Sequence, residues 1–184
     1  NDIFNDRKRF LNTRAMILEL LKMGIVPIIN ENDTVSIDEI MFGDNDILAS
    51  KVAAMMDADL LILLTDIDGL YSNNPKTNKR ARLISNLNEE SFDSQVINDI
   101  ESQVSFGGMS SKINAALDVS KFGIPTIIAN GKNKNVLKDI FGSKDVGTAI
   151  IPSSIKIGSR KKWIGMGPRS SGKIHLDSGA ANAI

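Results

Sequence analysis

The pattern of apolar and polar positions predicts helices that alternate with short buried strands. Apolar residues recur at helical spacing over residues 6–23, and Gly24 then supplies the left-handed conformation that commonly ends a helix. The run IVPII at residues 25–29 has the continuous apolar character of a strand covered on both faces, and Pro27 favours a place near a strand end or sheet edge. We therefore predict a first helix that runs into a strand.

The same alternation continues along the chain. Helices are predicted over residues 46–56, 110–122 and 134–141, and strands over residues 60–64, 124–129 and 148–151. The polar stretch at residues 72–82 is typical of a surface excursion. Alternating helices and apolar strands predict an α/β fold with a mainly parallel sheet covered on both faces. Ligands of such sheets bind beyond the carboxyl ends of the strands, where the polar clusters of this chain fall.

Composition narrows the chemistry that these clusters can perform. The 184 residues are enough for one main core, and they include no Cys and a single His, His175. Disulfide scaffolds and thiol catalysis are thereby excluded, as is a His-based triad anywhere other than at His175. Lys plus Arg and Asp plus Glu both total 22, so no global basic field exists and any anion site must be local. No apolar run is long enough to span a bilayer and no signal-peptide pattern is present, so we expect a cytoplasmic protein.

Two polar clusters follow the first predicted strand. The sequence NEND occupies residues 30–33, and GDND occupies residues 43–46 at the start of a predicted helix. Carboxylates and amides gathered there could hold an ammonium group and hydrogen-bond a polar small molecule, whereas a helix N-terminus alone would favour an anion. The structural alternative is a polar turn followed by an Asp N-cap.

A third cluster, TDIDGLY at residues 65–71, lies at the carboxyl end of the next strand. Its two Asp residues do not make a calcium loop, because the Gly follows too early and the downstream bidentate Glu is missing. A nucleotide-facing loop fits better. The alternative is a strand-to-turn connection that uses Asp and Gly for their geometry.

A fourth cluster, FGGMSSK at residues 106–112, leads directly into a helix. Small residues let phosphate oxygens approach backbone N–H groups, and Lys112 adds a mobile cation one turn inside the helix. This is phosphate-site chemistry without a Walker motif, and its alternative is a flexible helix entry. Further on, residues 156–173 are locally basic around Trp163, which is typical of a solvated surface or of an RNA contact.

The order of the clusters INEND, GDND, LLTDxxGLY and GGMxxK closely resembles the amino acid kinase family, in particular its members that phosphorylate L-glutamate. The resemblance runs over nearly the whole chain. It implies a three-layer α/β sandwich with a central, mainly parallel sheet. It also implies transfer of the γ-phosphoryl group of ATP, with Mg²⁺ bridging the phosphates, to the side-chain carboxylate of L-glutamate, the first step of proline biosynthesis.

The resemblance also implies roles for individual residues. Lys112 would stabilise the transferring phosphoryl group and Asp46 would orient the catalytic lysines. L-glutamate would be bound by Asp33 and Asn45, with Asn30 and Asp44 nearby. The nucleotide would be contacted by Thr65, Asp66, Phe106, Gly107, Gly108, Met109, Ser110, Ser111 and Lys112. No protein residue is implied as a metal ligand.

The resemblance divides the chain at about residue 158. Residues 1–158 would form the kinase domain, and residues 159–184 a linker and the start of a PUA-like domain. The family's first phosphate loop would precede residue 1, so we expect a fragment that is inactive by itself. The family commonly forms dimers or tetramers, and RNA would be bound only through a complete PUA domain.

Alternatives remain open at this point. Other carboxylate, carbamate or nucleotide kinases share the fold, although the paired NEND and GDND clusters favour glutamate. A non-catalytic nucleotide- or amino-acid-sensing domain and an RNA-binding protein are alternatives from other classes.

Overall fold

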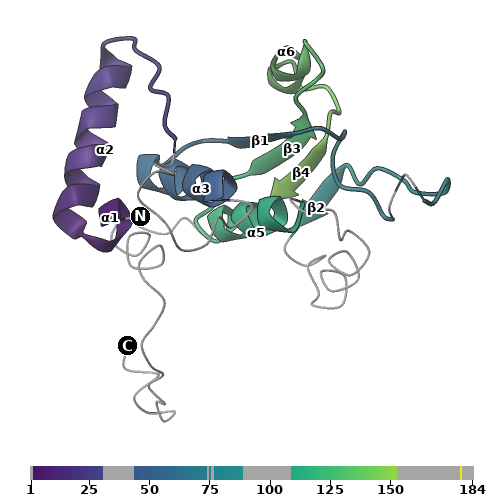
Figure 1. Ribbon diagram of the computed structural model, residues 1–184, viewed down its shortest axis with the longest axis horizontal. Helices are drawn as coiled ribbons and strands as arrows, with labels where there is room; N and C mark the ends of the chain where they lie inside the picture. Colours follow the sequence, from purple (N-terminus) through teal and green to yellow (C-terminus); the bar gives the residue numbers. More distant parts are fainter. Residues whose placement is uncertain are drawn as a thin grey trace, which may run out of the picture.

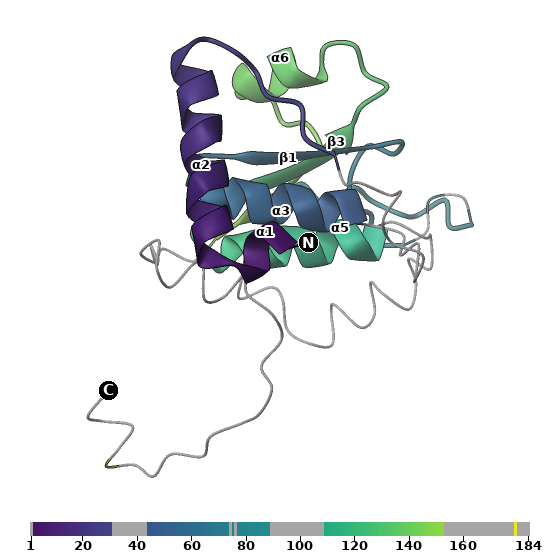
Figure 2. The ribbon, with the colours of Figure 1, turned by 60° about the vertical axis from the view of Figure 1, so that its left-hand side comes forward.

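The computed structural model describes residues 2–30, 44–73, 75, 77–88, 109–152 and 179. In this part of the chain a four-stranded sheet carries helices on both of its faces (Figure 1). Helices α3 (Asp44–Met56) and α5 (Met109–Ser120) cover one face, and α6 (Val136–Phe141) lies on the other, as Figure 2 also shows. The predicted α/β layers are confirmed.

The first long helix follows from local signals in the sequence. The short helix α1 (Asp2–Asn5) precedes α2 (Arg7–Lys22), whose N-cap is Asp6. The Asp6 carboxylate accepts a hydrogen bond from the Arg9 backbone N–H at 2.9 Å, and this bond is the main cause that lowers the pKa of Asp6 below 3.8. Gly24 ends the helix in the left-handed conformation with a φ of 74°.

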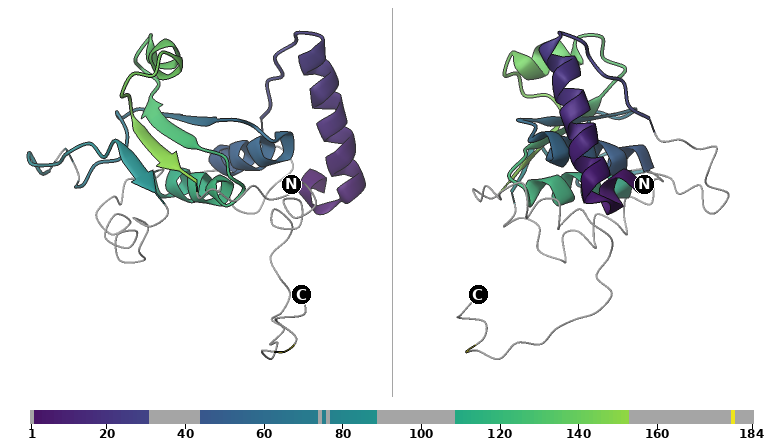
Figure 3. Two further views of the ribbon diagram at one scale, coloured as in Figure 1. Left: turned by 180° about the vertical axis from the view of Figure 1, so that it is seen from behind. Right: turned by 90° about the vertical axis from the view of Figure 1, so that its left-hand side faces the viewer.

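Helix α2 stands at one end of the sheet, opposite the excursion between residues 71 and 83 (Figure 3). Phe10 and Ile17 are its buried side chains. Arg14 ties it to α3, because its guanidinium donates to the Met55 carbonyl at 2.8 Å and contacts the Asp57 carboxylate at 2.9 Å.

The prediction of a strand over residues 25–29 is wrong. The segment forms no sheet pairing with any described residue, and Val26 and Ile28 are 81% and 98% exposed. An apolar run satisfies the strand pattern, but a strand also needs a neighbour to accept its backbone hydrogen bonds. The segment instead follows α2 as unpaired chain, and Pro27 has no N–H to donate.

The sheet has the order β1-β3-β4-β2. Strands β1 (Leu61–Thr65) and β3 (Thr126–Asn130) are parallel, with Leu61 opposite Thr126. Strand β4 (Thr148–Ile151) runs antiparallel to β3 and parallel to β2 (Asn86–Asn88). The sheet is therefore mainly parallel as predicted, although the short polar strand β2 was not predicted.

The main core lies between the sheet and the helices α3 and α5. Its most completely buried members include Ile128 and Ala116, both 0% exposed, and Leu70 at 1%. On the other face Ala129 packs with Val136 and Ile140 of α6. None of the helices in the described ranges is both long and apolar enough to cross a membrane.

Candidate functional site

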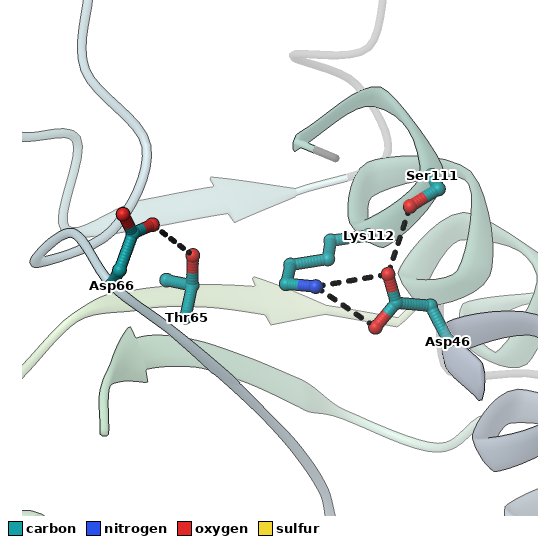
Figure 4. Close-up of polar contacts among 5 residues, drawn as sticks. All are labelled: Asp46, Thr65, Asp66, Ser111 and Lys112. Carbon is teal, nitrogen blue, oxygen red and sulfur yellow. Dashed lines mark hydrogen bonds and ion pairs between the residues drawn. The ribbon is translucent and has the colours of Figure 1, made fainter. Parts of the chain in front are cut away.

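The first group of predicted site residues meets where α3 and α5 pack together (Figure 4). The Lys112 ammonium lies 3.0 and 2.9 Å from the two oxygens of the Asp46 carboxylate, and the Ser111 hydroxyl donates to the same carboxylate at 2.8 Å. Asp46 is in the first turn of α3, and the other two residues are in the first turn of α5. We call these residues the cross-helix cluster.

The packing of α5 in the core fixes the position of this cluster. Met109 and Ile113 of α5 are 5% and 3% exposed in the main core, which fixes how the helix is rotated and turns Lys112 toward α3. The side chains of Asp46 and Lys112 are 15% and 17% exposed. A pair buried to this degree interacts more strongly than a surface pair, and loss of one partner leaves the other charge uncompensated.

The second group lies at the carboxyl ends of β1 and β3. The Thr65 hydroxyl donates to Asp66 at 3.4 Å, a long hydrogen bond. Asp68 accepts hydrogen bonds from the Asn130 side-chain amide at 2.9 Å and from the Tyr71 hydroxyl at 3.1 Å. We call Thr65, Asp66, Asp68, Tyr71 and Asn130 the strand-end network.

Two further contacts anchor this network. The backbone N–H of Gly131 donates to the Thr65 carbonyl at 2.9 Å, so the chain leaving β3 is tied to the end of β1. Beneath the loop, the buried Thr148 hydroxyl accepts from the Leu70 N–H at 2.8 Å and donates to the Ile84 carbonyl at 2.6 Å. Gly69 is required here, because a Cβ at this position would lie 2.7 Å from the Thr148 hydroxyl oxygen.

Tyr71 is the only tyrosine in the chain. Partial burial, and then its hydrogen bond to Asp68, raise the pKa of Tyr71 above 10.0. Both causes favour the neutral phenol, since burial disfavours a charge and an adjacent carboxylate repels a phenolate.

A cleft of about 410 Å³ brings together two of the residues predicted to bind a substrate. Asn30 and Asn45 line it with the 27–29 segment, α3 and the start of β1, and most of the remaining lining is apolar. Asp33 lies outside the described residues, and Asp44 is described only as the first residue of α3. The described part of the cleft thus offers two amide side chains on an apolar wall.

The predicted phosphate segment is described only from Met109 onward, so Phe106, Gly107 and Gly108 lie outside the described residues. The Met109 side chain belongs to the core, which leaves only its backbone to face a ligand. Ser110 is exposed, whereas the Ser111 hydroxyl is hydrogen-bonded to Asp46.

Two features of the site were not predicted from the sequence. Ser111 was predicted to contact nucleotide and its hydrogen bond to Asp46 was not, since the two residues are 65 positions apart. Asn130 was not singled out at all. Its place directly after an apolar strand is the same signal that identified Thr65 and Asp66, and it could have found Asn130 as well.

Comparisons with known proteins show which family the chain is similar to. The profile of the "Amino acid kinase family" matches residues 1–130. A glutamate 5-kinase of Thermoanaerobacter sp. (strain X514) is 46% identical over 98% of this chain and 49% of its own length. A glutamate 5-kinase of Syntrophus aciditrophicus is 48% identical over 97% of this chain and 47% of its own length. The chain thus spans about half the length of the curated relatives it matches.

Solved structures match at the level of the fold. A UMP kinase from Bacillus anthracis gives a TM-score of 0.55 at 21% identity and covers 77% of this chain and 52% of its own. A carbamate kinase from Giardia lamblia gives 0.54 at 22% identity, over 76% of this chain and 49% of its own. With the family profile matching well over half of its residues, the chain belongs to the amino acid kinase family.

Proposed function

We propose that this chain carries the catalytic core of a glutamate 5-kinase, a cytoplasmic enzyme that transfers the γ-phosphoryl group of ATP to the side-chain carboxylate of L-glutamate. The product, glutamyl 5-phosphate, would enter proline biosynthesis. The observation that carries the proposal is the Lys112–Asp46 pair at the packed ends of α3 and α5. The choice of glutamate as acceptor is supported by relatives of that name at 46% and 48% identity.

The chemistry suits the side chains that are present. A glutamate carboxylate is already ionised near neutral pH, because its reference pKa is about 4.3, so the nucleophile needs no general base. Catalysis can then rest on alignment and on neutralisation of charge at the transferring group. Lys112 supplies that positive charge, and Asp46 holds its ammonium group in place until a phosphoryl oxygen competes for it.

The surroundings of Lys112 suit the negative charge of a nucleotide. Lys112 lies one turn inside α5, whose N-terminus carries partial positive charge, and its side chain keeps 17% exposure. Thr65 and Asp66 would contact the nucleotide from the end of β1, and the segment from Phe106 to Lys112 would line its phosphates. When bound, ATP supplies the phosphoryl group, and Mg²⁺ neutralises part of the phosphate charge.

The acceptor would be bound by Asp33 and Asn45, with Asn30 and Asp44 nearby. Amide groups can hydrogen-bond the carboxylates of glutamate, and the two Asp residues would pair with its α-ammonium group. The Ser111 hydroxyl serves, in this proposal, to orient Asp46, in addition to its predicted contact with nucleotide.

Assembly and RNA binding are further parts of the proposal. Leu11, Met16 and Leu21 of α2 are each about half exposed, which is consistent with a homo-oligomer, and light scattering would measure its mass. RNA binding would require a complete PUA domain, and residues 159–178 lie outside the described part of the chain.

The test is acyl phosphate formation, trapped as the hydroxamate, with Mg²⁺, ATP and L-glutamate. It is run on the chain alone and on a chimera in which residues 1–184 replace the matching part of the Thermoanaerobacter relative. We expect turnover with L-glutamate in the chimera and none in the chain alone. A chimera that folds and binds ATP without turnover would support a sensing domain, and turnover only with another acceptor would overturn the choice of glutamate.

A further inference from the structure

The loop that follows β1 depends on a residue from a different strand. Asp68 is exposed, and of the donors in the described residues the Asn130 amide is the nearest to its carboxylate, at 2.9 Å. Asn130 is the last residue of β3, and it lies opposite Thr65 in the parallel ladder. One side chain therefore joins the ends of two neighbouring strands.

Asn130 is itself held in a defined orientation. Its side-chain oxygen accepts a hydrogen bond from the Lys132 backbone N–H at 2.9 Å, which leaves the NH₂ group directed at Asp68. The next residue, Gly131, donates its N–H to the Thr65 carbonyl at 2.9 Å. The turn after β3 thus contacts the 65–68 segment through its backbone and through one side chain.

We propose that Asn130 is a positioning residue for nucleotide binding, acting through Asp68 to hold Thr65 and Asp66 in place. This inference rests on the proposed function, because it takes the 65–66 segment as a nucleotide contact. The side-chain hydrogen bond that joins Thr65 to Asp66 is long, at 3.4 Å, so these two side chains need further restraint from the rest of the loop. Asn130 is a neutral donor, and it restrains Asp68 without adding a charge that would compete with the phosphates.

The contact can be tested by exchanging its two partners. Asn130→Asp keeps an oxygen for the Lys132 N–H but places a second carboxylate beside Asp68, so it breaks this one hydrogen bond. In the double variant Asp68→Asn with Asn130→Asp, the amide and the carboxylate change places. The amide oxygen introduced at position 68 can still accept from the Tyr71 hydroxyl, so every contact of the pair can form again.

Asn133→Asp is the matched control. Asn133 is exposed in the same turn, and its side-chain oxygen accepts from the Asn135 N–H at 3.0 Å, a bond that Asp retains. The control introduces the same charge three residues away from Asn130. It therefore separates a general effect of negative charge on ATP from the loss of the contact with Asp68.

Two measurements decide the proposal. In the chimera, KM for ATP should rise about fivefold to tenfold in Asn130→Asp with kcat and KM for glutamate little changed, and the double variant should restore it. In the chain without nucleotide, amide hydrogen exchange over residues 66–70 should quicken in Asn130→Asp and recover in the double variant. The control should leave both unchanged.

An unchanged KM for ATP in Asn130→Asp, or a double variant that is no better than the single one, overturns the positioning role. A chimera that binds no ATP at all overturns the proposed function instead. In that case the exchange measurement still reports whether Asn130 restrains the loop, so the two failures are distinguishable.

Discussion

The cross-helix cluster and the strand-end network use the same kind of side chain in opposite ways. In the first, the carboxylate of Asp46 is 15% exposed and is matched by a cation on a helix packed against it. In the second, Asp68 is exposed and is held by the neutral donors Asn130 and Tyr71. A buried carboxylate needs an opposite charge to offset its lost hydration. An exposed carboxylate stays hydrated, and neutral hydrogen-bond donors are enough to fix its orientation.

The largest effect should come from removing the cation of the cross-helix cluster. Lys112→Met is expected to lower kcat of the chimera about 10²- to 10³-fold, because the transferring group loses a preorganised charge. Lys121→Met is the matched control, since Lys121 follows the same helix and pairs only at the surface with Asp118 at 2.8 Å. Equal hydroxamate formation by the two variants would contradict a role for Lys112 in phosphoryl transfer.

The second-largest effect should come from loss of the buried Thr148 hydroxyl, which hydrogen-bonds the loop after β1. Thr148→Val removes the acceptor of the Leu70 N–H, and a buried donor without a partner costs about 1–3 kcal/mol in the free energy of unfolding. Denaturant melts of the chain or the chimera would measure this loss.

The sheet provides a matched control for Thr148. Thr126 is also fully buried, but its hydroxyl has no hydrogen-bond partner among the described residues. Thr126→Val should therefore leave stability unchanged or raise it, because an unpaired polar atom is replaced by a methyl group. If both variants lost the same stability, the hydrogen bond to the loop would not be the cause in Thr148→Val.

A smaller effect is expected at Ser111, where it would separate the two roles considered for this residue. Ser111→Ala should lower kcat about tenfold with KM for ATP little changed, because Asp46 loses one charge-assisted hydrogen bond. Ser111→Thr keeps the hydroxyl and should retain activity, and Asn114→Ala, exposed on the same helix, should have no effect. A raised KM for ATP with unchanged kcat would instead make Ser111 a nucleotide ligand.

The smallest expected effect is the change in stability that accompanies the ionisation of Tyr71. Because its folded-state pKa is raised above 10.0, Tyr71 contributes stability that is fully present below the unfolded pKa and is lost as the pH rises through the folded pKa. The ultraviolet absorbance of tyrosinate reports Tyr71 alone, since the chain has one tyrosine. Asp68→Asn should lower this pKa toward 10.0, and an unchanged titration would contradict the contact with Asp68.

Local chemistry explains which elements could be predicted. Asp6 and Gly24 mark the ends of α2, and the run at residues 60–64 has a strand's apolar pattern, so each element carries its own signal. The segment at residues 25–29 carries the same signal without a strand beside it in the described residues, and the prediction there was wrong. Strand β2 is the converse case, because its three residues have no pattern and pair only because β4 lies next to them.

The candidate site divides in the same way. The order of its motifs, the types of side chain and their places at element ends were set by the sequence alone, because capping, turns and apolar runs act over a few residues. Only the tertiary structure decided that Lys112 and Ser111 meet Asp46, and that Asn130 meets Asp68. Those contacts join residues more than 60 positions apart, and they form because α5 packs on α3 and β3 pairs with β1.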